Sequence, residues 1–268
     1  MTTPVFLSPA LPSDLLLYVL RRHVYPTTLV ICSSQADFLT AASEDISRKW
    51  HRSTPTDRDH QELGEGESSQ HQDSIEEEAE GKHALLSSPL YQIAASRHIH
   101  VVYVPTVTHL RAYLSAFSPD ESRVPAPPFT SEGDGEPHII LYGLLNLHRD
   151  TSEWSAQGLI NTTSALVGLA HRLSWRAFVI EPLSDLEDIA LEEMLQETLP
   201  ILKGGARRLG PKFEEGAWSG RTVEIGRALG RWFRFQRAQW SNIGCNDQVF
   251  IKQSDQLESH ISISQAGE

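Results

Sequence analysis

The chain has 268 residues, of which 40% are hydrophobic and 22% charged, as is usual for a globular protein. No apolar run approaches the ~18 residues that span a bilayer, and no basic leader precedes the apolar stretch at 15–20, so we expect neither a membrane span nor a signal peptide. Cys32 and Cys245 lie far apart, which predicts unpaired thiols in a reducing compartment. Both the nucleus and the cytoplasm are such compartments, and the thiols do not choose between them.

The formal net charge of −12 is unevenly distributed along the chain. Between Asp57 and Glu80 stand ten acids and one base, a net −9, which leaves −3 for all the rest. Between Lys203 and Arg237 stand nine bases and three acids, a net +6. Such segregation says more about the partners of a protein than the total charge does.

The first third of the chain predicts a helix, a strand and a second helix. Apolar spacing predicts a helix over 12–22, the β-branched run 27–32 predicts a buried strand, and a further helix follows from residue 35. Residues 50–82 are polar and acidic, and they cannot bury enough apolar surface to offset the entropy of ordering. We therefore expect a disordered insertion over 50–82.

Beyond the insertion, the sequence predicts further alternation of helix and strand. The apolar run 138–147 is typical of a central parallel strand, and the proline-rich residues 118–136 predict a loose loop. The other predicted elements are helices over 85–97, 108–117, 155–174 and 184–199, strands over 99–104 and 176–180, and one or two strands within 221–235.

Strands that alternate with helices predict an α/β fold with a mostly parallel central sheet covered on both faces. We expect the last, basic strands to form an antiparallel edge of this sheet. The predicted domain is 1–237, interrupted by the insertion and the loop, and residues 238–268 are expected to be a flexible tail.

Residues 138–181 resemble part of the RecA-like core of the eukaryotic strand-exchange recombinases and their paralogs. In that family an apolar strand is followed by a short loop ending in Arg and by a helix that starts with a Glu-x-Ser-Ala-like sequence. Arg149, Glu153, Ser155 and Ala156 stand at these positions.

The flanking segments 97–114 and 219–235 also resemble the family, as does the order of elements from 27 to 235. The resemblance implies a RecA-like, P-loop-like three-layer sandwich.

The chain departs from this family at three separate functional positions. It contains no Gly-x4-Gly-Lys-Ser/Thr loop, whose backbone N–H groups and lysine cradle phosphates. The family's magnesium-holding aspartate falls at Tyr142, and its γ-phosphate-sensing residue falls near Pro182. We therefore expect a pseudo-ATPase with no catalytic residue, no cofactor and no bound metal, comparable to the small subunits of the Shu recombination-mediator complex.

The basic segment near the end of the chain is the candidate DNA-binding site. Bases interleaved with aromatic residues suit single-stranded nucleic acid, because cations follow the phosphates and rings stack on bases. The candidate residues are Lys203, Arg207, Arg208, Lys212, Arg221, Arg227, Arg231, Arg234 and Trp232. The alternatives are solvated charges on an edge strand with the aromatic residues in the core, an interface with an acidic partner, and contact with the chain's own acidic insertion.

Three functional hypotheses follow. The favoured one is a non-catalytic subunit of a DNA-repair or homologous-recombination complex, whose partners are a related RecA-like subunit or recombinase and single-stranded DNA. The second is an Elongator-type RecA-like subunit that acts in tRNA modification. The third is an α/β enzyme whose motif is not recognisable in the sequence.

Overall fold

The structure is a computed structural model that describes the larger part of the chain. The described residues are 3–22, 24–53, 84–87, 90–119, 124–127, 136–183, 191–202, 221–238 and 240. The chain divides into a unit over residues 1–237 and a second unit over residues 238–268, of which only Ala238 and Trp240 are described. The expected insertion beyond Ser53, most of the loop 118–136 and the expected tail lie outside the described residues.

The protein has an α/β fold built on a six-stranded parallel sheet, as the sequence predicts. The strand order is β3-β2-β4-β5-β1-β8, and a separate antiparallel pair is formed by β6 and β7. The strands are β1 (Val5–Leu7), β2 (Thr27–Ile31), β3 (Ile99–Tyr103), β4 (His138–Tyr142), β5 (Arg176–Ile180), β6 (Thr198–Pro200), β7 (Thr222–Glu224) and β8 (Arg234–Gln236).

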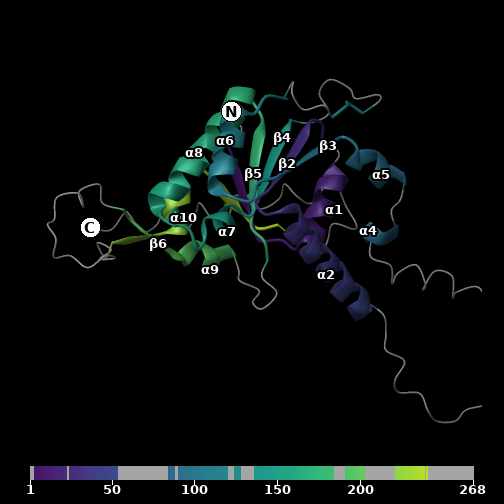
Figure 1. The fold of residues 1–268 in the computed structure, drawn as a ribbon, viewed down its shortest axis with the longest axis horizontal. Helices are drawn as coiled ribbons and strands as arrows, with labels where there is room; N and C mark the ends of the chain where they lie inside the picture. Colours follow the sequence, from purple (N-terminus) through teal and green to yellow (C-terminus); the bar gives the residue numbers. More distant parts are fainter. Residues whose placement is uncertain are drawn as a thin grey trace, which may run out of the picture. The chain divides into compact units, whose positions relative to one another are not determined.

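Helices lie on both faces of this sheet (Figure 1). One group contains α1, α2, α4 and α5, which pack around α1, and the other contains α6, α8 and α10, which pack around α8. The helices are α1 (Pro12–Arg22), α2 (Gln35–Ser53), α4 (Ala84–Ser87), α5 (Leu90–Ser96), α6 (Val107–Ala116), α7 (Leu144–His148), α8 (Ala156–Leu173), α9 (Leu191–Gln196) and α10 (Ile225–Leu229).

The core forms because both faces of the central strands are apolar. Ile139 and Leu141 on β4 pack into a cluster with the apolar side of α8, including Leu166. Successive side chains of a strand point to opposite faces, so Ile140 and Phe178, which are also buried, face the α1 side. Burial on both faces explains why these strands are continuous apolar runs.

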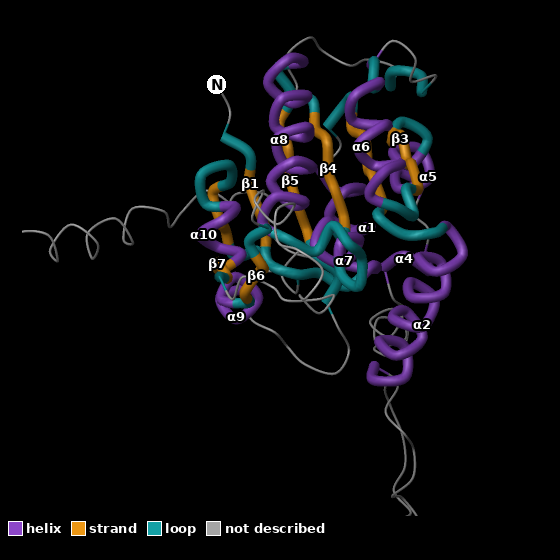
Figure 2. The backbone as a smooth tube through the Cα atoms, turned by 60° about the vertical axis from the view of Figure 1, so that its left-hand side comes forward, coloured by secondary structure: helices purple, strands orange, loops and turns teal. Residues whose placement is uncertain are grey.

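All six strands of the main sheet run in the same direction, so the sheet has two chemically different ends. We call the end at which the strands begin the amino edge, and the end at which they finish the carboxyl edge. The chain start lies above β1 at the amino edge, and α7, α9 and the β6–β7 pair lie at the carboxyl edge (Figure 2).

Several predicted boundaries differ from the structure. Helix α2 continues to Ser53, so the predicted start of the insertion at residue 50 is wrong. Ile46 and Trp50 lie on one face of this helix and line a hollow together with Leu86. The apolar run 138–147 is not one strand, because Gly143 adopts a φ of 90° and begins the short helix α7.

The end of the domain also differs in detail from the prediction. Helix α10 separates β7 from β8 where only strands were expected, and the acidic helix is confined, among described residues, to α9. The edge strand β8 pairs in parallel with β1, so the expected antiparallel edge is wrong; the antiparallel strand β7 pairs with β6 in the small sheet instead.

Candidate functional site

In open parallel sheets, ligands bind in the crevice outside the carboxyl ends of two neighbouring strands whose connections leave in opposite directions. Strands β1 and β5 meet this condition, since the chain leaves β1 towards β2 and leaves β5 towards β8. The loops after these two strands are joined by backbone hydrogen bonds. The N–H of Ala10 donates to the carbonyl of Glu181 at 2.9 Å, and the N–H of Leu183 donates to the carbonyl of Ala10 at 3.0 Å. Main-chain hydrogen bonds therefore close the crevice between β1 and β5.

Tyr142 at the end of β4 adds a third connection to this closure. Its hydroxyl donates to the carbonyl of Ala10 at 2.9 Å, and its buried ring packs against Phe38 with centroids 6.0 Å apart. This is the position at which the family resemblance places a magnesium-binding aspartate. The side chain present here is instead a structural link between β4 and the loop after β1.

The N-terminus of α1 would be the natural place for an anion at this edge, because its N–H groups point outward there. A carboxylate of the same chain already fills it. Asp45 on α2, only 2% exposed, accepts a hydrogen bond from the N–H of Ser13 at 3.0 Å. Lys49 donates to Ser13 Oγ at 2.6 Å and to Asp14 at 2.8 Å, and its Nζ lies 3.7 Å from Asp45. An incoming phosphate would have to displace Asp45.

A second buried carboxylate, Glu181, satisfies the N–H groups that start α7. It accepts hydrogen bonds from Leu145 at 2.9 Å and Asn146 at 3.3 Å and is 3% exposed. Burial raises the pKa of Glu181 to about 7, although these hydrogen bonds and Arg149 oppose the shift. Burial, together with the nearby Glu181, also raises the pKa of the Cys32 thiol well above its usual range, so that thiol stays protonated.

The hollow at the carboxyl edge is small, and two carboxylate side chains lie in its walls. It has a volume of about 220 Å³, and its walls include Asp37 and Glu44 beside Arg48, Phe38 and Pro182. The carboxylates of Asp37 and Glu44 repel phosphate. These residues therefore do not fit a magnesium–nucleotide complex.

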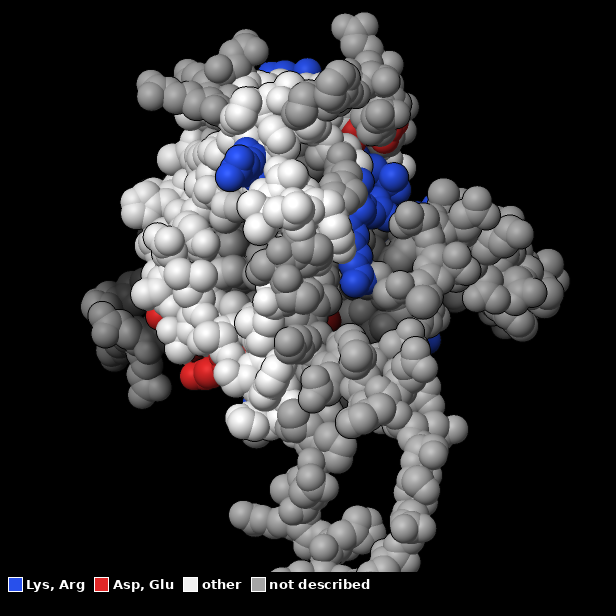
Figure 3. Space-filling model, turned by 90° about the vertical axis from the view of Figure 1, so that its right-hand side faces the viewer, with Lys and Arg blue, Asp and Glu red and all other residues white. Residues whose placement is uncertain are grey.

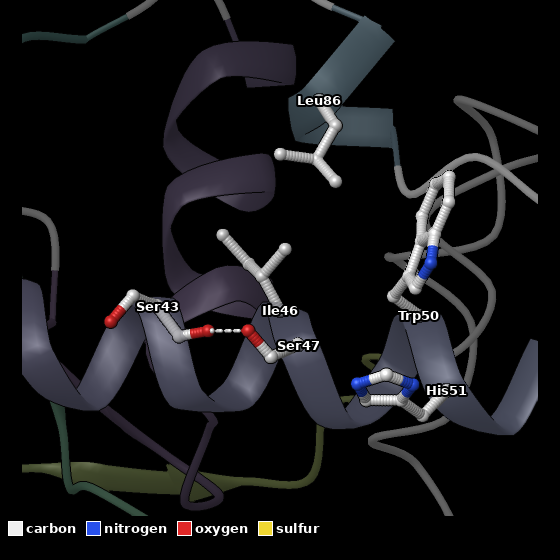
Figure 4. Close-up of a pocket in the computed structure, with 6 residues that line it drawn as sticks. All are labelled: Ser43, Ile46, Ser47, Trp50, His51 and Leu86. Atoms are coloured by element: carbon white, nitrogen blue, oxygen red, sulfur yellow. Dashed lines mark hydrogen bonds between the residues drawn. The ribbon is translucent and has the colours of Figure 1, made fainter.

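A larger hollow of about 400 Å³ lies between α2 and α4 (Figure 4). Ile46 and Leu86 point towards one another across it, with Trp50 and His51 at one end, and Ser47 donates to the carbonyl of Ser43 at 2.7 Å. Its lining includes one titratable side chain, His51, so it lacks an acid–base pair.

The block that carries the family resemblance is structural in this protein. Ser155 caps α8 by accepting from the N–H of Gly158 at 3.0 Å. Arg149 donates to Glu197 at 2.7 Å and lies 4.9 Å from the Trp154 ring, while Glu153 accepts from Arg111 at 2.7 Å. These contacts fasten the start of α8 to α6 and to the residue before β6.

The first part of the predicted basic segment, residues 203–220, stands in the chain between the two strands of the β6–β7 pair. Lys203, Arg207, Arg208 and Lys212 lie outside the described residues. The base of this hairpin is described: the N–H of Ile201 donates to Arg221, and the side chain of Gln157 exchanges two hydrogen bonds with the backbone of Leu202, at 2.9 and 3.1 Å. The chain therefore leaves the fold before residue 203 and rejoins it after residue 220 at the carboxyl edge, where α8 begins.

The structure separates the remaining candidate residues. Arg221 lies exposed at the hairpin base, whereas Arg234 begins β8 opposite Val5, at the amino edge. Arg227 is exposed on α10, which connects the two regions. Trp232 is half-buried against the hydrophobic core, and the guanidinium of Arg231 lies 5.6 Å from its ring centroid. The two ends of the predicted site thus lie at opposite edges of the sheet.

Sequence reasoning missed the closure of the crevice. Asp45 and Ser13 are 32 positions apart, and Glu181 ends a strand in an apolar context; no local pattern signals either carboxylate. Among the described residues, no group of three or more His, Cys, Asp or Glu side chains could hold a metal ion. No described helix is both long and apolar enough to cross a membrane.

No protein-family model matches this chain, and no curated protein matches it in sequence. Among solved structures, the chain is similar to one described as a DnaB-like replicative helicase and its interactions with primase, with a TM-score of 0.35 and 11% sequence identity. The match covers 69% of this chain and 40% of the helicase chain. The chain thus spans less than half of the length of that protein.

Proposed function

We propose that this chain is a non-hydrolysing, RecA-like subunit of a nuclear DNA-repair or homologous-recombination complex. In this role it pairs with a related RecA-like subunit or a recombinase and offers a basic hairpin to single-stranded DNA. The observation that carries the proposal is the closed crevice at the carboxyl edge. The loops after β1 and β5 are bonded to each other, and Asp45 and Glu181 fill the helix N-termini where phosphates could bind.

A closed crevice supports a role in assembly rather than in catalysis. Nucleotide turnover needs phosphate donors and a carboxylate that holds Mg²⁺, and at this edge both kinds of group are used to hold the protein together. The expected result of titration calorimetry is that Mg-ATP gives no binding heat with the purified chain. Micromolar binding would contradict the non-hydrolysing role.

An apolar surface over α4, α5 and β3 supports a protein partner. Leu86 is 54% exposed, Leu90 85%, Ile93 43% and Val101 41%, and β3 is an edge strand of the sheet. Adjacent exposed apolar side chains of this size are typical of interaction sites. The face that includes these elements is mostly free of charged side chains where it is described (Figure 3).

Affinity purification of the full chain from its native cells tests the partner. We expect a related RecA-like subunit or a recombinase to co-purify, and Leu90→Asp to lower its yield by tenfold or more, because a buried unpaired carboxylate costs several kcal/mol. Leu39→Asp, at a position 51% exposed on α2, is the matched control and should retain the partner. Recovery of tRNA-modification subunits instead would replace this proposal with the Elongator-type alternative.

The DNA role of the hairpin has its own test. Fluorescence anisotropy with labelled single-stranded DNA should show a log affinity that falls with log salt, at a slope of about −3 to −5 for four to six engaged cations. The triple variant Arg207→Glu, Arg208→Glu, Lys212→Glu should weaken binding to all sequences and flatten that slope. Binding that this variant leaves untouched would restrict the hairpin to protein contacts.

A further inference from the structure

The amino edge of the sheet gathers cationic side chains from segments that are far apart in the sequence. Arg176 is the first residue of β5, Arg234 the first of β8 and His138 the first of β4, and Arg97 stands two residues before β3.

The centre of this row is organised around the ring of Phe178. The guanidinium carbon of Arg176 lies 5.1 Å from the ring centroid and that of Arg22 5.8 Å, and the His138 ring stacks edge-on at 5.0 Å. Burial, reinforced by Arg22 and Arg176, lowers the pKa of His138 to about 4. The imidazole therefore stays neutral at physiological pH, and the positive charge at this place belongs to the guanidinium groups.

These arginines differ in their partners from three others among the described residues. Within the described part of the chain, no carboxylate forms an ion pair with Arg97, Arg176, Arg231 or Arg234. Arg111, Arg149 and Arg237, by contrast, are paired with Glu153, Glu197 and Glu192. The acid that the described residues place beside the strand starts is Glu136, which is exposed.

Helix dipoles explain only part of this arrangement. Basic residues favour the C-termini of helices, which accounts for Arg21 and Arg22 at the end of α1 and for Arg172 at the end of α8. Strand starts carry no comparable dipole. Arg176 packs over the Phe178 ring and Arg234 begins an edge strand, where charged side chains are common, and neither role neutralises the guanidinium.

We propose that the amino edge binds the phosphate backbone of duplex DNA. Neighbouring strands lie about 4.8 Å apart, so the five spacings from β3 to β8 make about 24 Å. The three guanidinium groups across this width stand at different levels along the strands: Arg176 is level with His138, Arg97 precedes β3 by two residues, and Arg234 is level with Phe178. A guanidinium matches phosphate in a bidentate way. None of the described Trp or Phe side chains is exposed, and the exposed ring of Tyr91 lies on α5 rather than at a strand start. The described strand starts therefore offer single-stranded bases few stacking platforms and suit a duplex backbone.

The test measures fluorescence anisotropy of a labelled, mixed-sequence duplex with the full chain from 50 to 300 mM salt. Four engaged cations predict a slope of log affinity against log salt of about −3 to −4. The variant Arg97→Gln, Arg176→Gln, Arg234→Gln should bind at least about tenfold more weakly at 50 mM salt, with a slope near −1. Because Arg176 contacts the core ring Phe178, the double variant Arg97→Gln, Arg234→Gln serves as a second test at fully exposed positions.

The matched control is Arg48→Gln, Arg149→Gln, Arg237→Gln, which removes the same charge from the carboxyl edge and should keep the slope of the parent chain. Equal duplex affinity of the parent and both amino-edge variants would overturn the proposal. It would also be overturned if the parent chain fails to bind the duplex, or if poly-glutamate displaces the duplex at equal charge concentration. Loss of single-stranded DNA binding in the hairpin variant, with duplex binding retained, would show that the two surfaces act separately.

Discussion

The carboxyl and amino edges of the same sheet use their charged side chains in opposite ways. At the carboxyl edge, Asp45 and Glu181 are buried and hold backbone N–H groups, and Arg149 is paired with Glu197. At the amino edge, Arg97 and Arg234 are exposed and have no ion pair among the described residues. Charge at the first edge stabilises the fold, whereas charge at the second remains available to bind a partner.

The strongest test of this contrast removes the carboxylate that fills the start of α1. Asp45→Ala leaves the N–H of Ser13 without its acceptor and Lys49 without one of its two carboxylates. We expect the free energy of unfolding to fall by about 3–4 kcal/mol, as it does when one partner of a buried pair is removed. Urea denaturation measures it. Glu44→Ala, one position earlier and exposed, is the control and should stay within about 0.5 kcal/mol.

The other buried carboxylate predicts a dependence of stability on pH. Glu181 ionises near pH 4.5 when unfolded and near pH 7 when folded, so between these values the folded state holds an extra proton. Its contribution to stability is therefore greatest below pH 4.5 and declines as pH rises to about 7, by about 3 kcal/mol in total. Glu181→Gln should remove this decline. Parallel stability curves for both proteins from pH 4.5 to 7.5 would show that Glu181 is not perturbed.

A smaller effect is expected from the link between β4 and the loop after β1. Tyr142→Phe removes the hydroxyl that donates to Ala10, whose carbonyl still accepts from the N–H of Leu183. We expect a loss of about 1 kcal/mol in the free energy of unfolding. Tyr103→Phe is the matched control, because its ring also packs against Phe38. If Tyr142→Phe were as stable as this control, the hydroxyl would not help to close the crevice.

The smallest changes in the free energy of unfolding are expected when one arginine is removed from each edge of the sheet. Arg149→Gln breaks a two-pronged pair with Glu197 and should cost about 0.5–1 kcal/mol, whereas Arg97→Gln should change the free energy of unfolding by less than about 0.3 kcal/mol. Thermal unfolding in low salt measures both. A cost for Arg97→Gln that equals or exceeds that of Arg149→Gln would mean that the amino-edge charges are also structural.

Most of the fold could be predicted because its central elements carry strong local patterns. The β-branched run in β2 and the amphipathic spacing of α8 are examples. Strand β1 could not be found in this way, since three apolar residues between Pro4 and Pro9 form too short a run. The run that begins β4 was assigned as too long a strand, because apolar residues alone do not distinguish a buried strand from the buried turn of helix α7 that follows Gly143.

The candidate surfaces were harder to predict than the fold. The basic segment was visible as a local excess of charge, but its Arg234 lies at the edge opposite to Arg221 because α10 crosses between them. The amino-edge row joins Arg97, Arg176 and Arg234, and only the strand order brings them to one end of the sheet. Sequence windows detect charges that are neighbours in the chain, and this row has none.

The pair of hydrogen bonds between Gln157 and Leu202 has a consequence for the segment that the β6–β7 pair carries. With Ile201 also bonded to Arg221, both ends of residues 203–220 are held at a fixed separation by the fold. The entropy cost of closing this loop is thus met during folding, and ligand binding does not incur it a second time. A change of sequence between these anchors therefore leaves in place the hydrogen bonds that hold the β6–β7 pair.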